Sequence, residues 1–231
     1  MPARILLFDL DGTLVLTGGA GVRALDRVFQ DLCGLKGAGR GVPFRGRTDL
    51  RIIRDIVERK LRRPMGAEEA AAICARYLPY LEEEVERSPT YRVLPGVPAL
   101  LTRLAAREDC LLGLGTGNLE AAARIKLARA DLNRFFPFGG FGSDAEDRVE
   151  LLRRAVARGE ARRAQSGADG PAEVVVIGDT PLDVQSGRAL GARTVAVATG
   201  GESPEVLEQA GPDVLLADLA DAEAFLRFLD V

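Results

Sequence analysis

The sequence predicts an α/β fold: a doubly wound, mostly parallel sheet with a small helical domain inserted after the first strand. From residue 92 onward, apolar segments alternate with segments of helical periodicity, as in folds whose helices cover both faces of a parallel sheet. The apolar segments are continuous, which is typical of strands buried on both faces. No convincing strand is seen between residues 14 and 108. We therefore expect a core domain of residues 1–14 and 92–231 and a helical domain of residues 15–91.

The first strand and the helical insert have separate signals. Residues 4–9 are predicted to form a short buried strand, and apolar residues at helical spacing predict a helix near residues 20–34. Thr48 is expected to cap the N-terminus of a second helix. Residues 67–87 have the pattern of a longer helix, which Pro79 should kink or divide because proline cannot donate a backbone hydrogen bond.

The rest of the core follows the strand–helix alternation. We expect strands at residues 110–115, 136–141, 174–177, 194–197 and 214–216. Helices should connect them. Ser143 and Glu146 have the spacing of a capping box and predict the start of a helix that reaches about Arg163. Pro204, after Ser203, should occupy the first position of another helix.

Composition excludes several classes of function. The net charge of −3 does not require a basic face, so we expect no nucleic-acid partner, and no apolar stretch approaches the length of a membrane span. Cys33, Cys74 and Cys110 are widely spaced, which suggests reduced, mostly buried thiols in a cytoplasmic protein. The apolar run before Asp9 is shorter than the apolar region of a signal peptide.

The chain contains no histidine. This absence excludes Ser-His-Asp and Cys-His catalysis, histidine general bases and the usual zinc sites. Any chemistry must therefore depend on carboxylates, hydroxyls, lysine or arginine, with a hard metal ion as the expected cofactor.

Polar residues follow three of the predicted strands. Asp9 and Asp11 follow the first strand, Thr116 the second, and Asp179 and Asp183 the strongest apolar segment. Ligands in parallel α/β sheets bind beyond the carboxyl ends of the strands, so we expect these side chains to converge. Four carboxylates in one place would raise one another's pKa values unless a cation is bound, and Mg²⁺ suits such oxygen ligands.

Each segment also has an ordinary structural interpretation. An Asp-Gly pair such as Asp11-Gly12 is common in turns. Thr116-Gly117-Asn118 could be a strand-to-helix cap, and the segment 178–183 could be a turn with Asp183 solvated in the first helical turn. Three such polar segments at the ends of three predicted strands are better explained by a shared functional site than by three separate caps or turns.

These segments, in this order and spacing, resemble the haloacid dehalogenase superfamily of aspartate-nucleophile phosphohydrolases. The motif DxDGT matches residues 9–13, the strand-end Thr or Ser matches Thr116, and GDxxxD matches residues 178–183. The helical insert corresponds to the family's cap. The cap stretch at residues 44–49 is similar to phosphoglycolate phosphatases and their relatives.

The resemblance implies roles for the matching residues. Asp9 would attack phosphorus and form an aspartyl-phosphate, while Asp11 would protonate the leaving alkoxide and then deprotonate the attacking water. Thr116 and the amide of Asn118 would hold phosphoryl oxygens. The remaining residues of these motifs that we expect to bind phosphate are Gly12, Thr13 and Gly117. Those that we expect to bind Mg²⁺ are Asp9, Asp179, Asp183 and the backbone carbonyl of Asp11.

One departure from the family concerns its usual lysine before the last motif. The last lysine of the chain is Lys126, so this position must hold an arginine or remain empty. Arg148 is our candidate, because arginine can make the same phosphate contacts. Alternatively, Arg148 is a surface residue that forms an ion pair with Asp144. In the cap, Arg45 or Arg47 could bind an anionic group of the substrate, although arginines in a Gly-rich loop are usually solvated.

We therefore expect a Mg²⁺-dependent phosphatase acting on a small, phosphoglycolate-like phosphomonoester. A 2-haloacid dehalogenase would share the nucleophile but would need neither Asp11 as an acid nor a metal ligand at Asp179. A phosphosugar mutase would have to protect phosphorylated Asp9 from water. A non-catalytic phosphoryl-binding module would need neither a nucleophile nor an acid.

Overall fold

The computed structural model describes residues 4–167 and 170–231. Within them the main sheet has six parallel strands in the order β5-β4-β1-β6-β7-β8. These strands are β1 (Arg4–Phe8), β4 (Cys110–Thr116), β5 (Gly139–Phe141), β6 (Glu173–Gly178), β7 (Arg193–Val197) and β8 (Val214–Leu216). The predicted α/β class and the mostly parallel sheet are confirmed.

The first strand lies at the centre of the sheet. It pairs with β4 on one side and β6 on the other, with Phe8 in register with Leu114 and Ile177. The chain fills one side of the sheet with β4 and β5 and then the other with β6, β7 and β8. β1 is therefore beside the point where the strand order reverses, and this is where open α/β sheets bind ligands.

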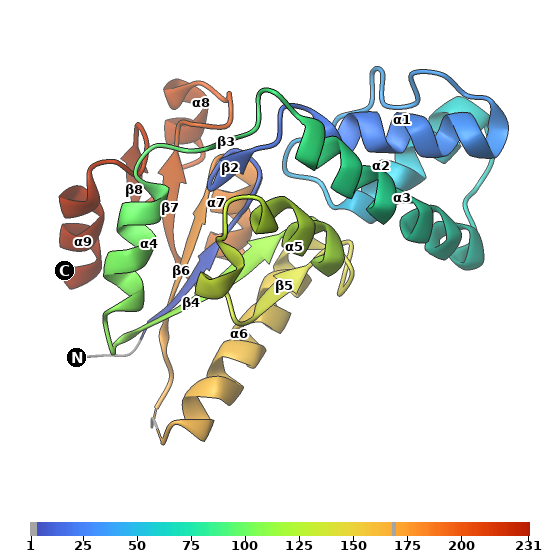
Figure 1. The fold of residues 1–231 in the computed structure, drawn as a ribbon. Helices are drawn as coiled ribbons and strands as arrows, with labels where there is room; N and C mark the ends of the chain where they lie inside the picture. Colours follow the sequence, from blue (N-terminus) through green and yellow to red (C-terminus); the bar gives the residue numbers. More distant parts are fainter. Residues whose placement is uncertain (1–3, 168–169) are drawn as a thin grey trace.

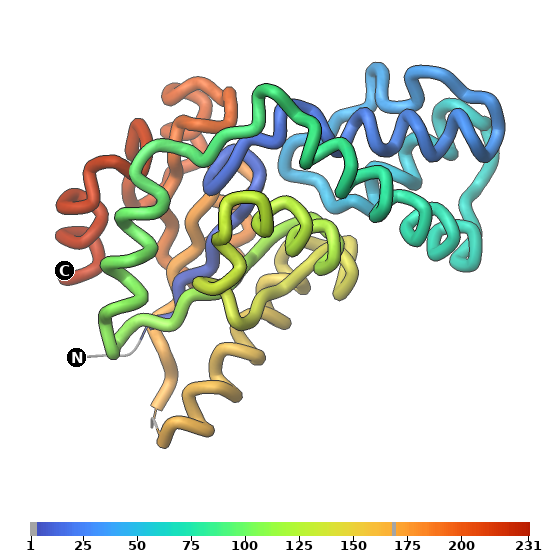
Figure 2. Tube along the Cα trace, in the orientation of Figure 1, coloured from blue at the N-terminus to red at the C-terminus, as the bar shows by residue number. Residues whose placement is uncertain are grey.

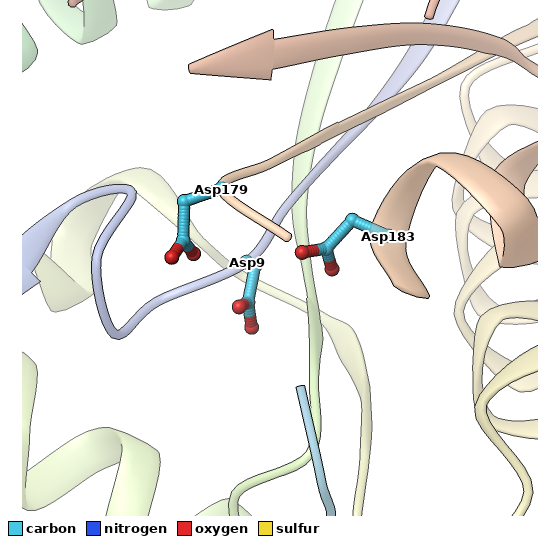
Figure 3. A group of neighbouring side chains, drawn as sticks. All are labelled: Asp9, Asp179 and Asp183. Atoms are coloured by element: carbon cyan, nitrogen blue, oxygen red, sulfur yellow. The ribbon is translucent and has the colours of Figure 1, made fainter. Parts of the chain in front are cut away.

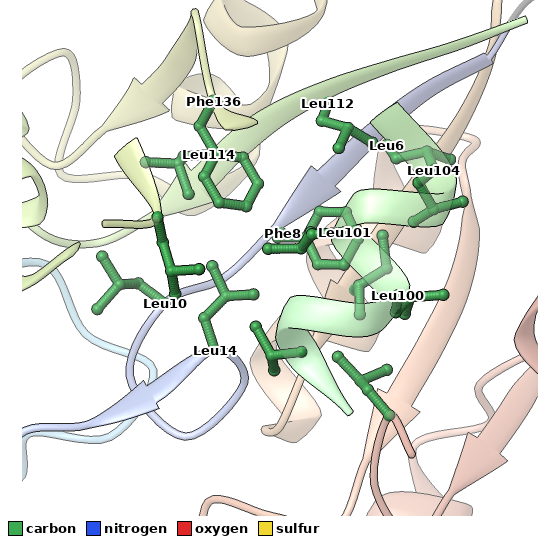
Figure 4. Packing of buried hydrophobic residues seen from close by; sticks show 14 of the residues in the cluster. Leu6, Phe8, Leu10, Leu14, Leu100, Leu101, Leu104, Leu112, Leu114 and Phe136 are labelled. Atoms are coloured by element: carbon green, nitrogen blue, oxygen red, sulfur yellow. The ribbon is translucent and has the colours of Figure 1, made fainter. Parts of the chain in front are cut away.

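Helices cover both faces of the sheet (Figure 1). They are α4 (Val97–Ala105), α5 (Glu120–Ala128), α6 (Arg148–Gln165), α7 (Pro181–Ala189), α8 (Pro204–Gln209) and α9 (Ala222–Asp230). Alternate residues of β1 enter different cores. Leu6 and Phe8 pack with leucines of α4 (Figure 4), in a cluster that also includes residues of α5 and α9. Ile5 and Leu7 instead pack with residues of α6. This double burial explains why the strand is a continuous apolar run.

The helical insert forms a separate layer beside the core (Figure 1). It contains α1 (Ala20–Cys33), α2 (Asp49–Ile56), a π-helical segment (Val57–Leu61) and α3 (Ala67–Arg87). Their apolar faces share one cluster, which Leu119 and Ala122 of the core complete. The predicted boundaries of the two domains remain a prediction.

Two short strands connect the insert to the core, and the sequence did not predict them. β2 (Val15–Leu16) and β3 (Arg92–Val93) form an antiparallel ribbon where the chain enters and leaves the insert (Figure 2). Strands of two residues are too short to show the alternation that identifies a strand.

Helix boundaries were predicted unevenly. Thr48 caps α2 as expected, because its side chain accepts a hydrogen bond from the amide of Arg51 at 3.3 Å. The capping box at Ser143 was wrong: α6 begins at Arg148, and its N-cap is Asp147. Ser143 instead accepts a hydrogen bond from the amide of Glu120 at 3.3 Å.

The helix that contains Pro79 is not divided. α3 runs from Ala67 to Arg87 with Pro79 inside it. Tyr77 and Leu81, on either side of the proline, are buried in the cluster of the insert. We infer that this packing offsets the loss of one backbone hydrogen bond.

Two further expectations concern the chain as a whole. Across the described ranges no helix is long and apolar enough to cross a membrane. All three cysteines are free, but Cys33 is exposed and Cys74 and Cys110 are partly buried, so the expectation of mostly buried thiols was wrong.

Candidate active site

Three carboxylates converge at the carboxyl edge of the sheet. Asp9 directly follows β1, Asp179 directly follows β6, and Asp183 lies in the first turn of α7. All three are buried, and one oxygen of each lies within 4.8 Å of the others (Figure 3). The parallel register of β1 and β6 brings the first two together. The predicted ligands Asp9, Asp179 and Asp183 are thus adjacent.

The cluster is electrostatically unfavourable without a cation. Burial raises the pKa of Asp179 to about 9, and the neighbouring carboxylates of Asp183 and Asp9 add to this effect. Burial also raises the pKa of Asp9 to about 6, against the opposing effect of the Arg148 guanidinium. A divalent cation among these oxygens would favour their ionised forms.

The surrounding backbone and donor set suit a Mg²⁺ ion. Three carboxylates offer only hard oxygen ligands, which is the kind of site that Mg²⁺ prefers. Glycines allow the close approach of Asp179: a Cβ on Gly12 or Gly200 would lie 2.4 or 1.6 Å from its Oδ2 atom. Asp9, Asp179 and Asp183 would hold the metal.

Asp183 has a second, structural role. Its side chain accepts hydrogen bonds from the Thr180 amide at 3.0 Å and hydroxyl at 2.6 Å, which completes a capping box at the start of α7. The alternative of a helix cap is therefore correct in part. Because Asp183 is only 2% exposed, it is not the solvated residue of that interpretation.

Arg148 lies in the site. Its side chain is 9% exposed, pairs with Asp183 and places Nη2 3.5 Å from Asp9 Oδ1. Its Nε is buried and has no hydrogen-bond partner in residues 4–167 and 170–231. The surface alternative is not observed, since Asp144 pairs with Arg158 at 2.6 Å.

The Asp11 carboxylate is separate from the three clustered carboxylates. Its Oδ2 atom accepts hydrogen bonds from Lys126 Nζ at 2.6 Å and from Asn118 Nδ2 at 2.9 Å. The same lysine donates to Asn118 Oδ1 at 2.6 Å. The predicted contact of Asp11 with a metal is through its backbone carbonyl and stays a prediction.

Lys126 is the residue that the sequence analysis missed. It is on α5 and its side chain is 6% exposed. Burial acts to lower its pKa, but Asp11 and Asp49 outweigh this and hold the pKa above its ordinary value. A signal existed: Lys126 follows Ala122 and Ala123 by four and three residues, which places it on the same helix face as those buried alanines.

The predicted phosphate-binding segments also meet here. Thr116 is fully buried at the end of β4, and its hydroxyl accepts a hydrogen bond from Asn118 Nδ2 at 2.8 Å. Thr13 donates a hydrogen bond to Asp179 at 3.2 Å. Gly117 lies against the cap, since a Cβ there would be 2.4 Å from the carbonyl oxygen of Arg47. These contacts bring all the predicted segments to one edge of the sheet.

The helical insert is hydrogen-bonded through Asp49 to the segment that follows β4. The backbone amide of Asp49 donates to the Gly117 carbonyl at 2.8 Å, and its carboxylate accepts from the Leu119 amide at 2.9 Å. Burial raises the pKa of Asp49 to about 6, with Lys126 opposing. This residue was not predicted to belong to the site.

A cavity of about 460 Å³ lies between cap and core. Its core wall contains Asp9, Asp11, Gly12, Thr116, Gly117, Asn118, Lys126, Arg148, Asp179 and Thr180. The two cap arginines, Arg45 and Arg47, also line it. Arg47 is paired with the buried carboxylate of Asp55, and Arg45 is 59% exposed beside Glu202. Their predicted contact with a substrate therefore remains a prediction.

The family model and the similar curated proteins agree on the family to which this sequence is similar. A family described as haloacid dehalogenase-like hydrolase matches residues 3–191. A phosphoglycolate phosphatase from Synechococcus elongatus is 32% identical over 135 residues, which cover 58% of each chain. A pyrophosphatase PpaX from Listeria monocytogenes is 26% identical over 229 residues, covering 96% of this chain and 95% of that one.

The fold agrees with this comparison. A solved structure described as a putative beta-phosphoglucomutase from Bacteroides vulgatus superposes with a TM-score of 0.68 at 24% identity. The match covers 99% of this chain and 89% of that chain.

Proposed function

The chain belongs to the haloacid dehalogenase-like hydrolases, and on that premise we propose that it is a Mg²⁺-dependent phosphatase of small phosphorylated metabolites. One observation carries the proposal. The Asp9 carboxylate lies with two carboxylates that could hold a metal ion and beside Arg148, while Asp11 is held separately by Lys126. A nucleophile and a proton-transfer group are thus kept in different electrostatic surroundings, as two-step phosphoryl transfer requires.

In the first step, a carboxylate oxygen of Asp9 forms a bond to phosphorus while the ester P–O bond breaks. Arg148 favours the ionised form of Asp9 that this attack needs, and its guanidinium lines the cavity beside Asp9. The leaving alkoxide takes a proton from Asp11. Bound Mg²⁺ would neutralise charge on the phosphoryl oxygens and the three carboxylates.

In the second step, water attacks the phosphorus of the aspartyl-phosphate. Asp11 accepts a proton from this water, so that its own protonation state is restored. The bond from phosphorus to Asp9 breaks, which regenerates the carboxylate and releases phosphate. Thr116 and the amide of Asn118 would hold phosphoryl oxygens through both steps.

Two of the three alternatives are distinguished by residues of the site, and the third is distinguished by its product. A dehalogenase has no need of the Asp11 acid or of Asp179, whereas both belong to the arrangement described above. A phosphoryl-binding module has no need of Asp9 beside Arg148. A phosphosugar mutase would use the same residues, and it is distinguished by its product, a phosphosugar isomer in place of free phosphate. Phosphoglycolate, which names one relative, is one candidate within the proposed class.

The test is hydrolysis of a generic aryl phosphate with Mg²⁺ and with a chelator. We expect metal-dependent release of phosphate by the native chain and loss of at least about a thousandfold in Asp9→Asn. Asp131→Asn is the matched control, because Asp131 is an exposed residue of positive φ that asparagine tolerates. An unchanged rate in Asp9→Asn, or a rate that ignores the chelator, would contradict the proposal.

A further inference from the structure

The cap side of the cavity holds most of its apolar lining, in contrast to the core wall, and Thr17, Arg45, Arg47 and Asp49 also line this side. It is lined by Leu16, Val22, Leu25, Phe44, Ile52 and Tyr77. Leu25 and Ile52 belong to the buried cluster of the insert, and Phe44 packs against it. A phosphoryl group at Asp9 would leave the rest of a substrate facing these side chains, because core wall and cap wall bound the same cavity.

The charged residues near this wall are poorly suited to a second anion. Asp49 is a buried carboxylate in the cavity wall. The guanidinium of Arg47 is already paired with Asp55, whose side chain is 2% exposed. Arg45 is mostly exposed and contacts the Gly201 carbonyl at 3.2 Å. A carboxylate on the substrate would meet the buried Asp49 carboxylate, and Nη1 of each arginine already has a protein partner.

One neutral polar group interrupts the apolar wall. Tyr77 is 1% exposed and lines the cavity. Its hydroxyl lies beside Gly21, where an added Cβ would be 3.2 Å away. Within the described part of the chain no hydrogen bond of this hydroxyl is observed. The hydroxyl oxygen is not among the buried polar atoms of the described residues that lack a partner, so it is open to the cavity, where a ligand atom could pair with it.

We propose that the substrate is the phosphate ester of an uncharged, mainly apolar alcohol or phenol that carries one neutral polar atom for Tyr77. This inference rests on the proposed phosphatase function and names its substrate class. Pockets of several hundred Å³ with apolar walls and a few polar groups bind ligands well above the size of glycolate. Each additional buried methylene should raise kcat/KM by about fourfold until the cavity is filled.

The first test compares two substrates of the same shape. In isobutyl phosphate, two methyl groups replace the two carboxylate oxygens of phosphoglycolate. We expect kcat/KM to be at least tenfold higher for isobutyl phosphate, and higher again for benzyl phosphate. A kcat/KM for phosphoglycolate that equals or exceeds that of isobutyl phosphate would overturn the inference.

The second test assigns the preference to the cap wall. Val22 is only partly buried, so Val22→Lys should fold and add a cation there. We expect it to shift the ratio of kcat/KM values at least tenfold towards phosphoglycolate. Val22→Thr, which keeps the shape and adds no charge, should shift the ratio by less. An unchanged ratio in folded Val22→Lys would show that the leaving group does not reach this wall.

The third test concerns the Tyr77 hydroxyl. Native enzyme should prefer at least one ring-hydroxylated benzyl phosphate over benzyl phosphate, and Tyr77→Phe should bring the ratio of the two kcat/KM values close to one. Equal effects on all substrates would remove Tyr77 from recognition. Metal-dependent hydrolysis of any of these esters retains the proposed function whatever the ranking, whereas no hydrolysis of any ester overturns both.

Discussion

Removing one carboxylate from the buried cluster should stabilise the metal-free protein. The pKa of Asp179 is raised from 3.8 to about 9 in the folded state. Between these values the folded chain retains a proton that the unfolded chain releases. Its contribution to the free energy of unfolding is therefore most favourable at low pH and is lost as the pH rises through this window. Asp179→Asn removes the ionisable group and should raise stability at pH 8.

The size of the effect follows from the pKa values. The interval from 3.8 to pH 8, at 1.36 kcal/mol for each pH unit, sets an upper bound of about 6 kcal/mol on the change in the free energy of unfolding. If a third of this bound, about 2 kcal/mol, is realised, Tm should increase by about 4–8 °C, because 1 kcal/mol corresponds to about 2–4 °C in a chain of this length.

The assay is thermal unfolding with a chelator and with Mg²⁺, at pH 5 and pH 8. Mg²⁺ should raise the Tm of the native protein at pH 8, and much less that of Asp179→Asn. Asp49→Asn is the matched control. Burial also raises the pKa of Asp49, to about 6, but Asp49 lies outside the cluster of three carboxylates. It should keep the full response to Mg²⁺. A lower metal-free Tm for Asp179→Asn at pH 8, or an unchanged response to Mg²⁺, would refute this reasoning.

Two further predictions concern the basic side chains of the site. Lys126→Met should lower kcat by about 10- to 100-fold, because Asp11 and Asn118 lose a buried, charged hydrogen-bond donor. Steady-state kinetics would measure the change, with substitution of the exposed Lys60 by Met as the control. A near-native kcat would show that Lys126 does not position Asp11. Arg148→Ala should weaken phosphate binding and turnover by about a hundredfold. Inhibition by inorganic phosphate would report the binding, with Arg153→Ala, 59% exposed, as control, and equal inhibition constants would remove Arg148 from the phosphate site.

The sequence was sufficient for the residues that follow strands. A parallel sheet aligns strand ends, so Asp9 and Asp179 are brought together by the register of β1 and β6. Arg148 was predicted because the chain has no lysine after Lys126, so an arginine was expected at the position of the family's lysine before the last motif. Its ion pairs with Asp9 and Asp183 could not be predicted from the sequence, because they depend on how the elements pack.

Other features depend on contacts that sequence patterns do not report. Lys126 is separated from Asp11 by more than a hundred residues, and a single lysine in a helix is usually solvated. Asp147 and Ser143 are both good helix caps, and tertiary contacts decide between them. Arg47 has the position of a substrate-binding residue, but its pairing with Asp55 depends on how the loop before α2 folds back.

The central claim is a covalent phosphoryl group on Asp9, and it can be measured directly. The native chain and Asp11→Asn would be mixed with an aryl phosphate and Mg²⁺, quenched in acid during turnover and analysed by peptide mass spectrometry. We predict that the peptide containing Asp9 gains the mass of one phosphoryl group, more in Asp11→Asn because water attack is slowed. A phosphoryl group on another residue, or none during rapid metal-dependent turnover, would contradict the account.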